Sequence, residues 1–356
     1  MDNLKNIVMT AIKSAEAGID TSPSGNEKKQ NQAKEIVAFV TEHIELFHDE
    51  NKDVFARNKN TNIVHRLDSR QFKDWLMASF YEKEDKSLRD QSLREALSTL
   101  SGIGRYHGKE HSVQIRVAKD DNNYYLDLCQ PGNSKVIKIS PGHWELIETS
   151  PVRFVRSETL QPLPEPIPGG NLSNLWKICN IPEPSQLLIV AWLAECLRPE
   201  TPYPVLELLG EQGSAKSTTQ TALRRIIDAN SCELRGVPKS PEDVFVSSSV
   251  NHMMSFENVS HLSAATQDAF CIVATGGGYA TRKFYTNNEE VVIQAKNPIV
   301  VNAISAVITA QDLIDRAITV ELPIIKERTE ITELRRAFEQ ERAAILGGLL
   351  DIMSKP

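Results

Sequence analysis

A short glycine-containing turn between an apolar run and a helical pattern constrains this chain more than any other feature. Residues 210–218 read G-E-Q-G-S-A-K-S-T; an apolar run at 204–209 precedes them, and residues 219–227 follow with helical spacing. A strand, loop and helix in this order bring backbone N–H groups to a helix N-terminus, where they bind phosphate. The turn therefore predicts a site for a nucleoside triphosphate, with ATP and Mg²⁺ as the expected ligands.

The residues of this turn have separate expected roles. Lys216 would reach the β- and γ-phosphates, and the Ser217 hydroxyl would be a ligand of Mg²⁺. Ala215 stands where the G-x-x-x-x-G-K-[ST] pattern has its second glycine, so a negative φ is expected there to accommodate the Cβ atom. The residues expected to bind nucleotide are Gly210, Glu211, Gln212, Gly213, Ser214, Ala215, Lys216, Ser217 and Thr218.

Composition argues against several classes of protein. The chain has 356 residues, of which 40% are hydrophobic and 24% charged, and its formal net charge is −7. This acidic balance argues against a surface that binds nucleic acid all over. The five cysteines form no C-x-x-C pair, which favours reduced thiols in the cytoplasm and no metal site of cysteines. The longest apolar stretch, 187–197, is too short to span a bilayer, so no membrane association is expected.

Apolar periodicity and proline content divide the chain. A helix is expected over 32–47 and a short β pair near 54–66, whereas residues beyond 111 alternate apolar and polar side chains as in an antiparallel meander. The fold class is therefore an α/β P-loop NTPase with a parallel sheet, preceded by a mixed α+β region. The expected parts are a mostly helical N-terminal region (1–110), a small β meander (111–161), a Pro-rich linker (162–171), the ATPase domain (172–325) and a helical tail that reads as shortened (326–356).

Polar residues at the ends of two later strands narrow the chemistry. Glu257 follows an apolar strand and is expected to hold the Mg²⁺ water shell. Asn258 beside it can hydrogen-bond a water but cannot accept its proton. Asn302 ends another buried strand and is a candidate contact for the γ-phosphate or for the attacking water.

Basic residues mark two further features. Arg316 precedes the final strand, where it would either reach the γ-phosphate of a neighbouring subunit or pair with Asp312 or Asp315. Arg282 and Lys283, followed by aromatic residues, lie in an expected hairpin and suit contact with phosphate and bases. A solvated hairpin that binds nothing is the alternative reading of so small a patch.

Residues 205–323 resemble superfamily 3 helicases in the order of their motifs. A phosphate-binding loop is followed by an acid, a hairpin, an Asn that ends a strand, and an Arg. The likeness is greatest to the helicase halves of phage, plasmid and poxvirus primase–helicases. The loop is also similar to those of minichromosome maintenance helicases and magnesium chelatases, which likewise carry an alanine before the lysine. In the amino-terminal half, E-L-F-H-D at 45–49, F-x-x-W-L at 72–76 and P-V-R-F at 151–154 are similar to ATP-binding proteins of bacterial mobile elements.

The resemblance implies a P-loop ATPase of the AAA+ class that assembles as a homo-oligomer, a hexamer in this family, with single-stranded or forked DNA in its central pore. By this resemblance Lys216, Ser217 and Glu257 serve the nucleotide and Mg²⁺, and Arg316 acts on a neighbouring subunit. Arg282 and Lys283 would contact DNA. Two departures, T-G-G-G in place of T-G-G-D and Asn258 in place of a second acid, are consistent with slow hydrolysis.

Three functions compete on this basis. The first is a DNA-dependent ATPase and helicase that replicates a phage, plasmid or other mobile element, with residues 1–165 recruiting DNA, a primase or an origin-binding protein. The second is an ATP-gated oligomeric switch that binds nucleotide and assembles without unwinding DNA. The third, a small-molecule kinase, is disfavoured because the sequence has no lid of clustered arginines.

Overall fold

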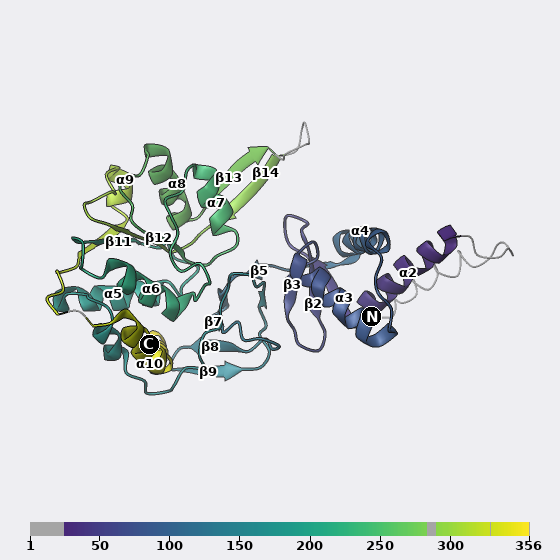
Figure 1. The fold of residues 1–356 in the computed structure, drawn as a ribbon, viewed down its shortest axis with the longest axis horizontal. Coiled ribbons are helices and arrows are strands. Elements are labelled where there is room, and N and C mark those ends of the chain that lie inside the picture. The colour runs from purple at the N-terminus through teal and green to yellow at the C-terminus, as the bar shows by residue number, and fades with distance from the viewer. Residues whose placement is uncertain (1–24, 283–289, 328, 356) are drawn as a thin grey trace.

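The computed structural model describes residues 25–282, 290–327 and 329–355 (Figure 1). An N-terminal unit of helices and a small sheet lies beside a larger α/β body, and an antiparallel sheet extends from the base of that body. The helices are α2 (Gly25–His43), α3 (Arg70–Glu84), α4 (Asp90–His107), η1 (Leu172–Lys177), α5 (Glu183–Glu195), α6 (Lys216–Ile227), α7 (Pro241–Ser248), α8 (Ala264–Thr275), α9 (Gln311–Ile314) and α10 (Ile331–Met353).

The strands form three four-stranded sheets and two two-stranded ribbons within the described residues. They are β1 (Ile44–His48), β2 (Val54–Asn58), β3 (Val64–Arg66), β4 (Lys109–Glu110), β5 (Val113–Gln114), β6 (Val117–Asp120), β7 (Asn123–Asp127), β8 (Val136–Ser140), β9 (His143–Ile147), β10 (Arg153–Phe154), β11 (Val205–Leu209), β12 (Met254–Phe256), β13 (Gly277–Arg282), β14 (Glu290–Ala295), β15 (Ile299–Ala303) and β16 (Ala317–Glu321). None of the helices in the described ranges is long and apolar enough to cross a bilayer.

The N-terminal unit contains more sheet than its sequence predicts. Its strands lie in the order β3-β2-β1-β4, and α2, α3 and α4 share a core with them. The helix expected over 32–47 ends at His43, and the next five residues form β1, which pairs antiparallel with β2. Ile44 and Phe47 fit a helical period, but ladder hydrogen bonds and burial against β2 outweigh that local preference. Residues 1–24 of the expected helical N-terminal region lie outside the described residues.

A fully parallel sheet in the order β12-β15-β11-β16 organises the α/β body. Successive side chains of a strand point to opposite faces, and the cores follow that alternation. Leu206 and Leu208 of β11 pack with α5 and α6, whereas Val205 and Leu209 pack with α7 and α8. Because both faces are covered by helices, β11 and β15 are mostly apolar, as expected for a buried parallel sheet.

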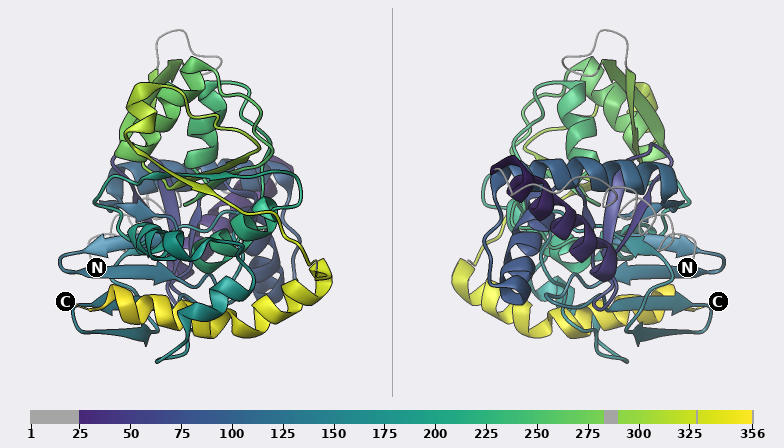
Figure 2. Two further views of the ribbon diagram at one scale, coloured as in Figure 1. Left: turned by 90° about the vertical axis from the view of Figure 1, so that its left-hand side faces the viewer. Right: turned by 90° about the vertical axis from the view of Figure 1, so that its right-hand side faces the viewer.

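The antiparallel sheet β6-β7-β8-β9 and helix α10 belong to the same core as the α/β body. Leu126 and Ile137 of the sheet, Leu223 and Ile226 of α6, and Leu346 of α10 are members of one buried cluster. Figure 2 shows α10 (yellow) running beneath the helices of the body and past the strands of the antiparallel sheet. The expected division into a separate meander (111–161) and a separate tail (326–356) therefore does not separate hydrophobic cores.

The proline-rich segment expected to be a linker is docked on α10. The Ile167 N–H donates to the Ala343 carbonyl at 3.1 Å, and the Gly169 N–H donates to Asp351 Oδ2 at 2.9 Å. A Cβ atom on Gly347 would lie 1.9 Å from the Ile167 carbonyl oxygen, so only glycine permits this approach. The segment is thus a fixed part of the body and not a free spacer.

A buried ionic cluster joins the antiparallel sheet to the end of α6. Asp228 is fully buried, accepts from Arg116 Nε at 3.1 Å and lies 3.8 Å from Arg224. Arg116, also fully buried, donates further to the carbonyls of Asp127, Gln161 and Ala229. It adopts φ 62 between β5 and β6, so the alternating stretch expected beyond residue 111 is divided there between two sheets. The pKa of Asp228 would be raised by burial, but the two guanidinium groups outweigh that and hold it below its usual value.

Beside this cluster, buried His252 makes folding stability depend on pH. Its Nε2 donates to the Cys196 carbonyl at 2.8 Å, and burial lowers the pKa of the imidazole. Above about pH 6.5 both folded and unfolded chains hold it neutral. Below that pH the unfolded chain gains a proton that the folded chain excludes, so the free energy of unfolding falls by up to about 1.4 kcal/mol per pH unit.

Urea unfolding at pH 8 and pH 5.5 measures this effect, with His252→Gln as the variant that keeps an N–H donor but does not titrate. His65, whose pKa burial also lowers, contributes equally to both proteins. We expect a smaller loss of stability on acidification in the variant. Identical pH dependence in the two proteins would show that His252 does not contribute.

Candidate functional site

The parallel sheet brings most of the sequence-predicted site residues to one edge. The loop 210–215 follows the end of β11, Glu257 follows β12 and Asn302 lies near the end of β15. Because these strands are parallel, their carboxyl ends meet at the same edge of the sheet, where α/β proteins bind their ligands. Strand β15 separates β11 from β12, so Asn302 lies between the loop and the acid.

The loop 210–215 turns the chain sharply into α6. Gly210 has φ 154, and a Cβ there would lie 2.6 Å from Ser214 Oγ and 2.8 Å from the Leu322 carbonyl oxygen. Ala215 has φ 55 and ψ 31, the left-handed conformation, so the expected negative φ at this position is wrong. This conformation costs an L-residue about 1–2 kcal/mol, which contacts elsewhere in the fold must offset. The position keeps the backbone shape of the missing glycine although it carries a Cβ.

The start of α6 offers donors suited to an anion. Among the described residues, the backbone amides of Ala215, Lys216, Ser217 and Thr218 have no hydrogen-bond acceptor. Lys216 Nζ lies over the loop, donating to the Gly210 carbonyl at 2.6 Å and to the Glu211 carbonyl at 2.9 Å, and burial lowers the pKa of this ammonium group. Four free amides at the N-terminus of a 12-residue helix, with an ammonium beside them, fit a phosphate group.

Two oxygen-bearing side chains next to these donors would suit a hard cation. Ser217 Oγ donates to Glu257 Oε2 at 3.3 Å, so the hydroxyl and the carboxylate are adjacent. Mg²⁺ is bound in proteins through one or two such oxygens, with water and phosphate supplying the rest of its octahedral shell. The donor set therefore fits a magnesium ion that arrives with a polyphosphate, and no larger group of ligating side chains is found in the described parts of the chain.

Asn302 is held in the interior and orients its neighbours. Its Nδ2 donates to Gln220 Oε1 at 2.6 Å and its Oδ1 accepts from the Asn258 N–H at 2.9 Å. Gln220, on α6, in turn donates to Ser255 Oγ at 2.8 Å. This series of hydrogen bonds from α6 through Asn302 to Asn258 fixes the backbone conformation after β12. Asn258 adopts φ 52 there and is exposed. Both polar atoms of Asn302 are thus engaged within the chain.

Arg316 lies away from this cluster. It directly precedes β16, which runs parallel to β11 with Ala317 opposite Val205, so Arg316 is at the amino edge of the sheet. The five paired residues of β11 put it about 16 Å from the carboxyl edge where the loop 210–215 lies. Its side chain is exposed and donates to the Asp312 carbonyl at 2.5 Å; within the described residues it forms no ion pair with Asp312 or Asp315. It cannot serve the loop of its own chain.

The expected hairpin is present as β13 and β14. Gly277 lies opposite Ala295 at one end of the paired strands, and Arg282 lies opposite Glu290 at the other. It projects from the α/β body beside α7 (Figure 1), and Tyr279 stacks on Phe245 of that helix with centroids 4.7 Å apart. Of the three glycines of the T-G-G-G segment, Gly276 alone has a positive φ, because the other two begin β13. Arg282 is the last described residue of β13, and Lys283 lies outside the described residues.

Two residues that sequence reasoning did not single out support this region. Buried Glu207, in the centre of β11, accepts from the amides of Val307 and Ile308 at 2.9 and 3.1 Å and from Thr319 Oγ1 at 2.8 Å. The signal in the sequence was an acidic residue within an otherwise apolar strand, which indicates a buried acid with hydrogen-bond partners. Asn180, between η1 and α5, donates to the Ser214 carbonyl of the loop at 3.0 Å. A single Asn in a connecting segment offered no signal.

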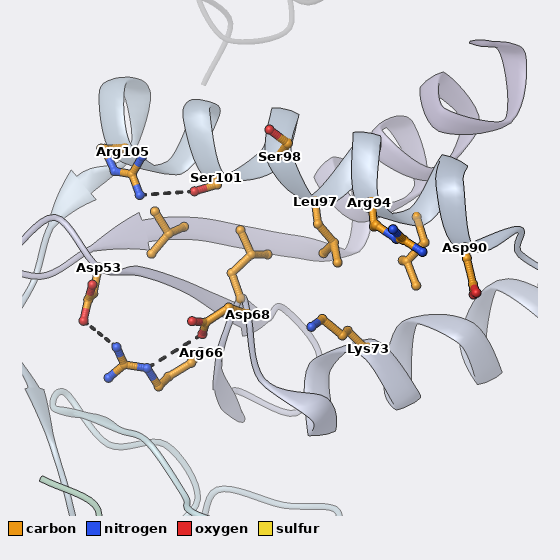
Figure 3. Close-up of a pocket in the computed structure, with 13 residues that line it drawn as sticks. Asp53, Arg66, Asp68, Lys73, Asp90, Arg94, Leu97, Ser98, Ser101 and Arg105 are labelled. Atoms are coloured by element: carbon orange, nitrogen blue, oxygen red, sulfur yellow. Dashed lines mark hydrogen bonds and ion pairs between the residues drawn. The ribbon is translucent and has the colours of Figure 1, made fainter. Parts of the chain in front are cut away.

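A cavity of about 530 Å³ in the N-terminal unit contains none of the predicted site residues. Figure 3 shows it between α4, the start of α3 and the loop after β3. Its charges are mixed: Arg66 pairs with Asp53 and lies 3.8 Å from Asp68, and Arg105 donates to Ser101 at 3.3 Å. The candidate functional site is therefore the carboxyl edge of the parallel sheet and not this cavity.

Fold and site together define an α/β protein whose parallel sheet presents a turn rich in amide donors, a lysine and an acid at one edge. Residues 172–356, more than half of the chain, match the profile of the actinomycete integrative conjugative element replication proteins. The chain belongs to that family, which makes it a replication protein of a mobile genetic element. The matched region contains the whole parallel sheet, the hairpin and α10.

Comparison with other proteins adds only distant likenesses. No curated protein matches the sequence. Two apo structures of the C-terminal region of NrS-1 have TM-scores of 0.49 and 0.48 at 13% and 12% identity, covering 90% and 92% of this chain and 68% and 72% of theirs. A ligand-bound JCV helicase has a TM-score of 0.31 at 15% identity over 51% of this chain and 53% of its own. At these scores the likenesses carry no functional weight.

Proposed function

We propose that this chain is an ATP-dependent DNA helicase or translocase acting in the replication of its mobile element. The observation that carries this proposal is the grouping at one sheet edge of four free amides, Lys216, and the Ser217–Glu257 pair. Amides and lysine would bind the β- and γ-phosphates of ATP, and the Ser–Glu pair would hold Mg²⁺ between them. When bound, that ion neutralises charge on the transferring phosphoryl group.

The chain's own residues then set the course of hydrolysis. The chain of hydrogen bonds from Gln220 through Asn302 fixes the backbone at Asn258, whose exposed amide would orient a water molecule against the phosphate. Asn258 cannot take the proton from that water. Arg316, at the far edge of the sheet, would stabilise transition-state charge in the site of an adjoining subunit.

DNA is the expected partner of the hairpin. The base of the hairpin is anchored by Tyr279, which stacks on Phe245. In the sequence, the described arms of the hairpin flank the segment that contains Lys283. Basic and aromatic residues together suit single-stranded DNA, because phosphates meet the cations and bases stack on the rings. Translocation would follow if ATP turnover moves such hairpins in an oligomer relative to one another.

Steady-state ATP turnover with and without single-stranded DNA tests this proposal. We expect DNA to raise turnover several-fold, and Lys216→Ala to abolish it, because the variant loses the ammonium that reaches the phosphates. Lys239→Ala removes an exposed lysine of the same α/β body and serves as the matched control, with turnover unchanged. Turnover in the Lys216→Ala variant equal to that of the control would contradict the assignment of the site.

An ATP-gated oligomeric switch is the second candidate, and the exposed amide of Asn258 favours it, because an amide at this place suits slow hydrolysis. The same experiment separates the two functions. A switch binds Mg·ATP and assembles in its presence, and its turnover does not respond to DNA. A helicase responds to DNA and separates the strands of a forked duplex.

A further inference from the structure

Asn180 connects three parts of the molecule that meet behind the loop 210–215. It lies in the short segment between η1 and α5, 34 residues before Ser214 of the loop. Its Nδ2 donates to the Ser214 carbonyl at 3.0 Å and to the Pro323 carbonyl at 2.6 Å, and its backbone N–H donates to Thr219 Oγ1 at 3.0 Å. One half-buried residue thus contacts the loop, the first turn of α6 and the segment after β16.

The Ser214 carbonyl belongs to the peptide group that also carries the Ala215 N–H. Holding that carbonyl fixes the plane of the peptide, and the plane fixes φ of Ala215. Ala215 has φ 55, a conformation that only glycine adopts without cost. If the peptide rotated to relieve this strain, its N–H and C=O would exchange directions. A carbonyl oxygen would then face the phosphate in place of an amide donor.

Other contacts hold the loop but leave this peptide free to rotate. Ser214 Oγ donates to the Glu211 carbonyl at 2.9 Å, and the Ile325 N–H donates to the Gly213 carbonyl at 3.3 Å. Among the described residues, Asn180 alone donates to the Ser214 carbonyl. Ser214 itself is fully buried, so water does not replace that donor.

We propose that Asn180 is a positioning residue of the candidate nucleotide site, and that it holds the loop 210–215 in its binding conformation by stabilising the left-handed backbone of Ala215. It compensates for the absence of a glycine at position 215. The inference rests on the proposed function, since it assigns Asn180 to the same ATP site.

A double-mutant cycle of Asn180→Ala and Ala215→Gly tests the proposal, with fluorescent Mg·ATP analogue binding and the urea unfolding midpoint as readouts. In the natural background we expect Asn180→Ala to weaken binding about tenfold, the size of the left-handed cost. With glycine at 215 the left-handed backbone is free of strain, so the loss should shrink to less than about threefold. The unfolding midpoint should show the same non-additivity without any nucleotide.

Asn174→Ala is the matched control, because Asn174 of η1 donates to Glu341 at 2.6 Å and does not contact the loop. We expect its nucleotide affinity to equal that of the natural chain. Equal losses from Asn180→Ala in both backgrounds, in binding and in stability, would overturn the positioning role. If the natural chain bound no ATP but the stability cycle were non-additive, the proposed function would fail while the role of Asn180 in the loop stood.

Discussion

Replacing Arg316 by alanine should lower the turnover number for ATP by about 10³-fold or more while leaving the affinity for Mg·ATP nearly unchanged. The reason is geometric: Arg316 is exposed at the amino edge of the sheet, and its own loop 210–215 lies at the carboxyl edge. In the proposed oligomer its guanidinium would therefore contribute to the site of another subunit, where it would meet charge that develops in the transition state. Turnover and equilibrium binding, measured separately, check both halves of this expectation.

Mixing two inactive variants gives a sharper test of action between subunits. An Arg316→Ala subunit keeps an intact loop, and a Lys216→Ala subunit keeps an intact arginine, so some contacts in a mixed assembly have both. We expect activity to reappear on mixing. Arg336→Ala, which removes an exposed arginine of α10, is the control and should keep full turnover. Loss of binding and turnover together in Arg316→Ala, with no recovery on mixing, would make the residue structural.

Replacing Asp228 by alanine should destabilise the fold by about 3–5 kcal/mol, the cost of leaving buried charge without its partner. Arg116 and Arg224 are both fully buried and would face each other without a carboxylate between them. The Met253 N–H, which donates to Asp228 Oδ2 at 3.0 Å, would lose its acceptor. The midpoint of urea unfolding, followed by the fluorescence of the tryptophans packed in the body, measures the change.

Two further variants separate charge from geometry in this cluster. Asp228→Asn keeps a hydrogen-bond acceptor and the shape of the side chain but removes the charge. Its loss of folding stability should therefore be smaller than that of Asp228→Ala but well above zero. Asp74→Ala breaks the exposed pair with Arg70 (N–O 3.3 Å) and should cost no more than about 0.5 kcal/mol. If Asp228→Ala proved as mild as Asp74→Ala, the cluster would not hold the antiparallel sheet to α6.

The strongest local patterns predicted most of the α/β body. Apolar runs flanked by turn residues identified β11 and β15, and the order loop, acid and Asn placed three polar positions that the parallel sheet does bring to one edge. Such runs are reliable because a strand covered on both faces is mostly apolar, and a buried acid such as Glu207 is accepted there only with hydrogen-bond partners. The helix expected over 32–47 failed at Ile44, where pairing with β2 replaced a helical turn.

What the sequence could not show are contacts between distant residues. A negative φ at Ala215 is the local preference of an L-residue, and hydrogen bonds such as that from Asn180, more than 30 positions earlier, outweigh it. The alternating stretch beyond residue 111 is interrupted at Arg116, whose buried guanidinium bonds to Asp228, more than a hundred residues later. Helix α10 read as a charged tail, yet Gly347 and Gly348 on its buried face were a signal of close approach by another segment.

The separation of Arg316 from its own loop restricts the symmetry that an assembly of this chain can adopt. In a two-fold dimer residue i of one subunit meets residue j of the other and j meets i, so a dimer would complete both sites only if one patch held both edges of the sheet. If Arg316 acts on an adjoining subunit as proposed, the alternative is a head-to-tail contact, the carboxyl edge of one subunit against the amino edge of the next. Contacts of that heterologous kind repeat until they close into a ring or continue as a helical filament, and every site in the closed ring is complete.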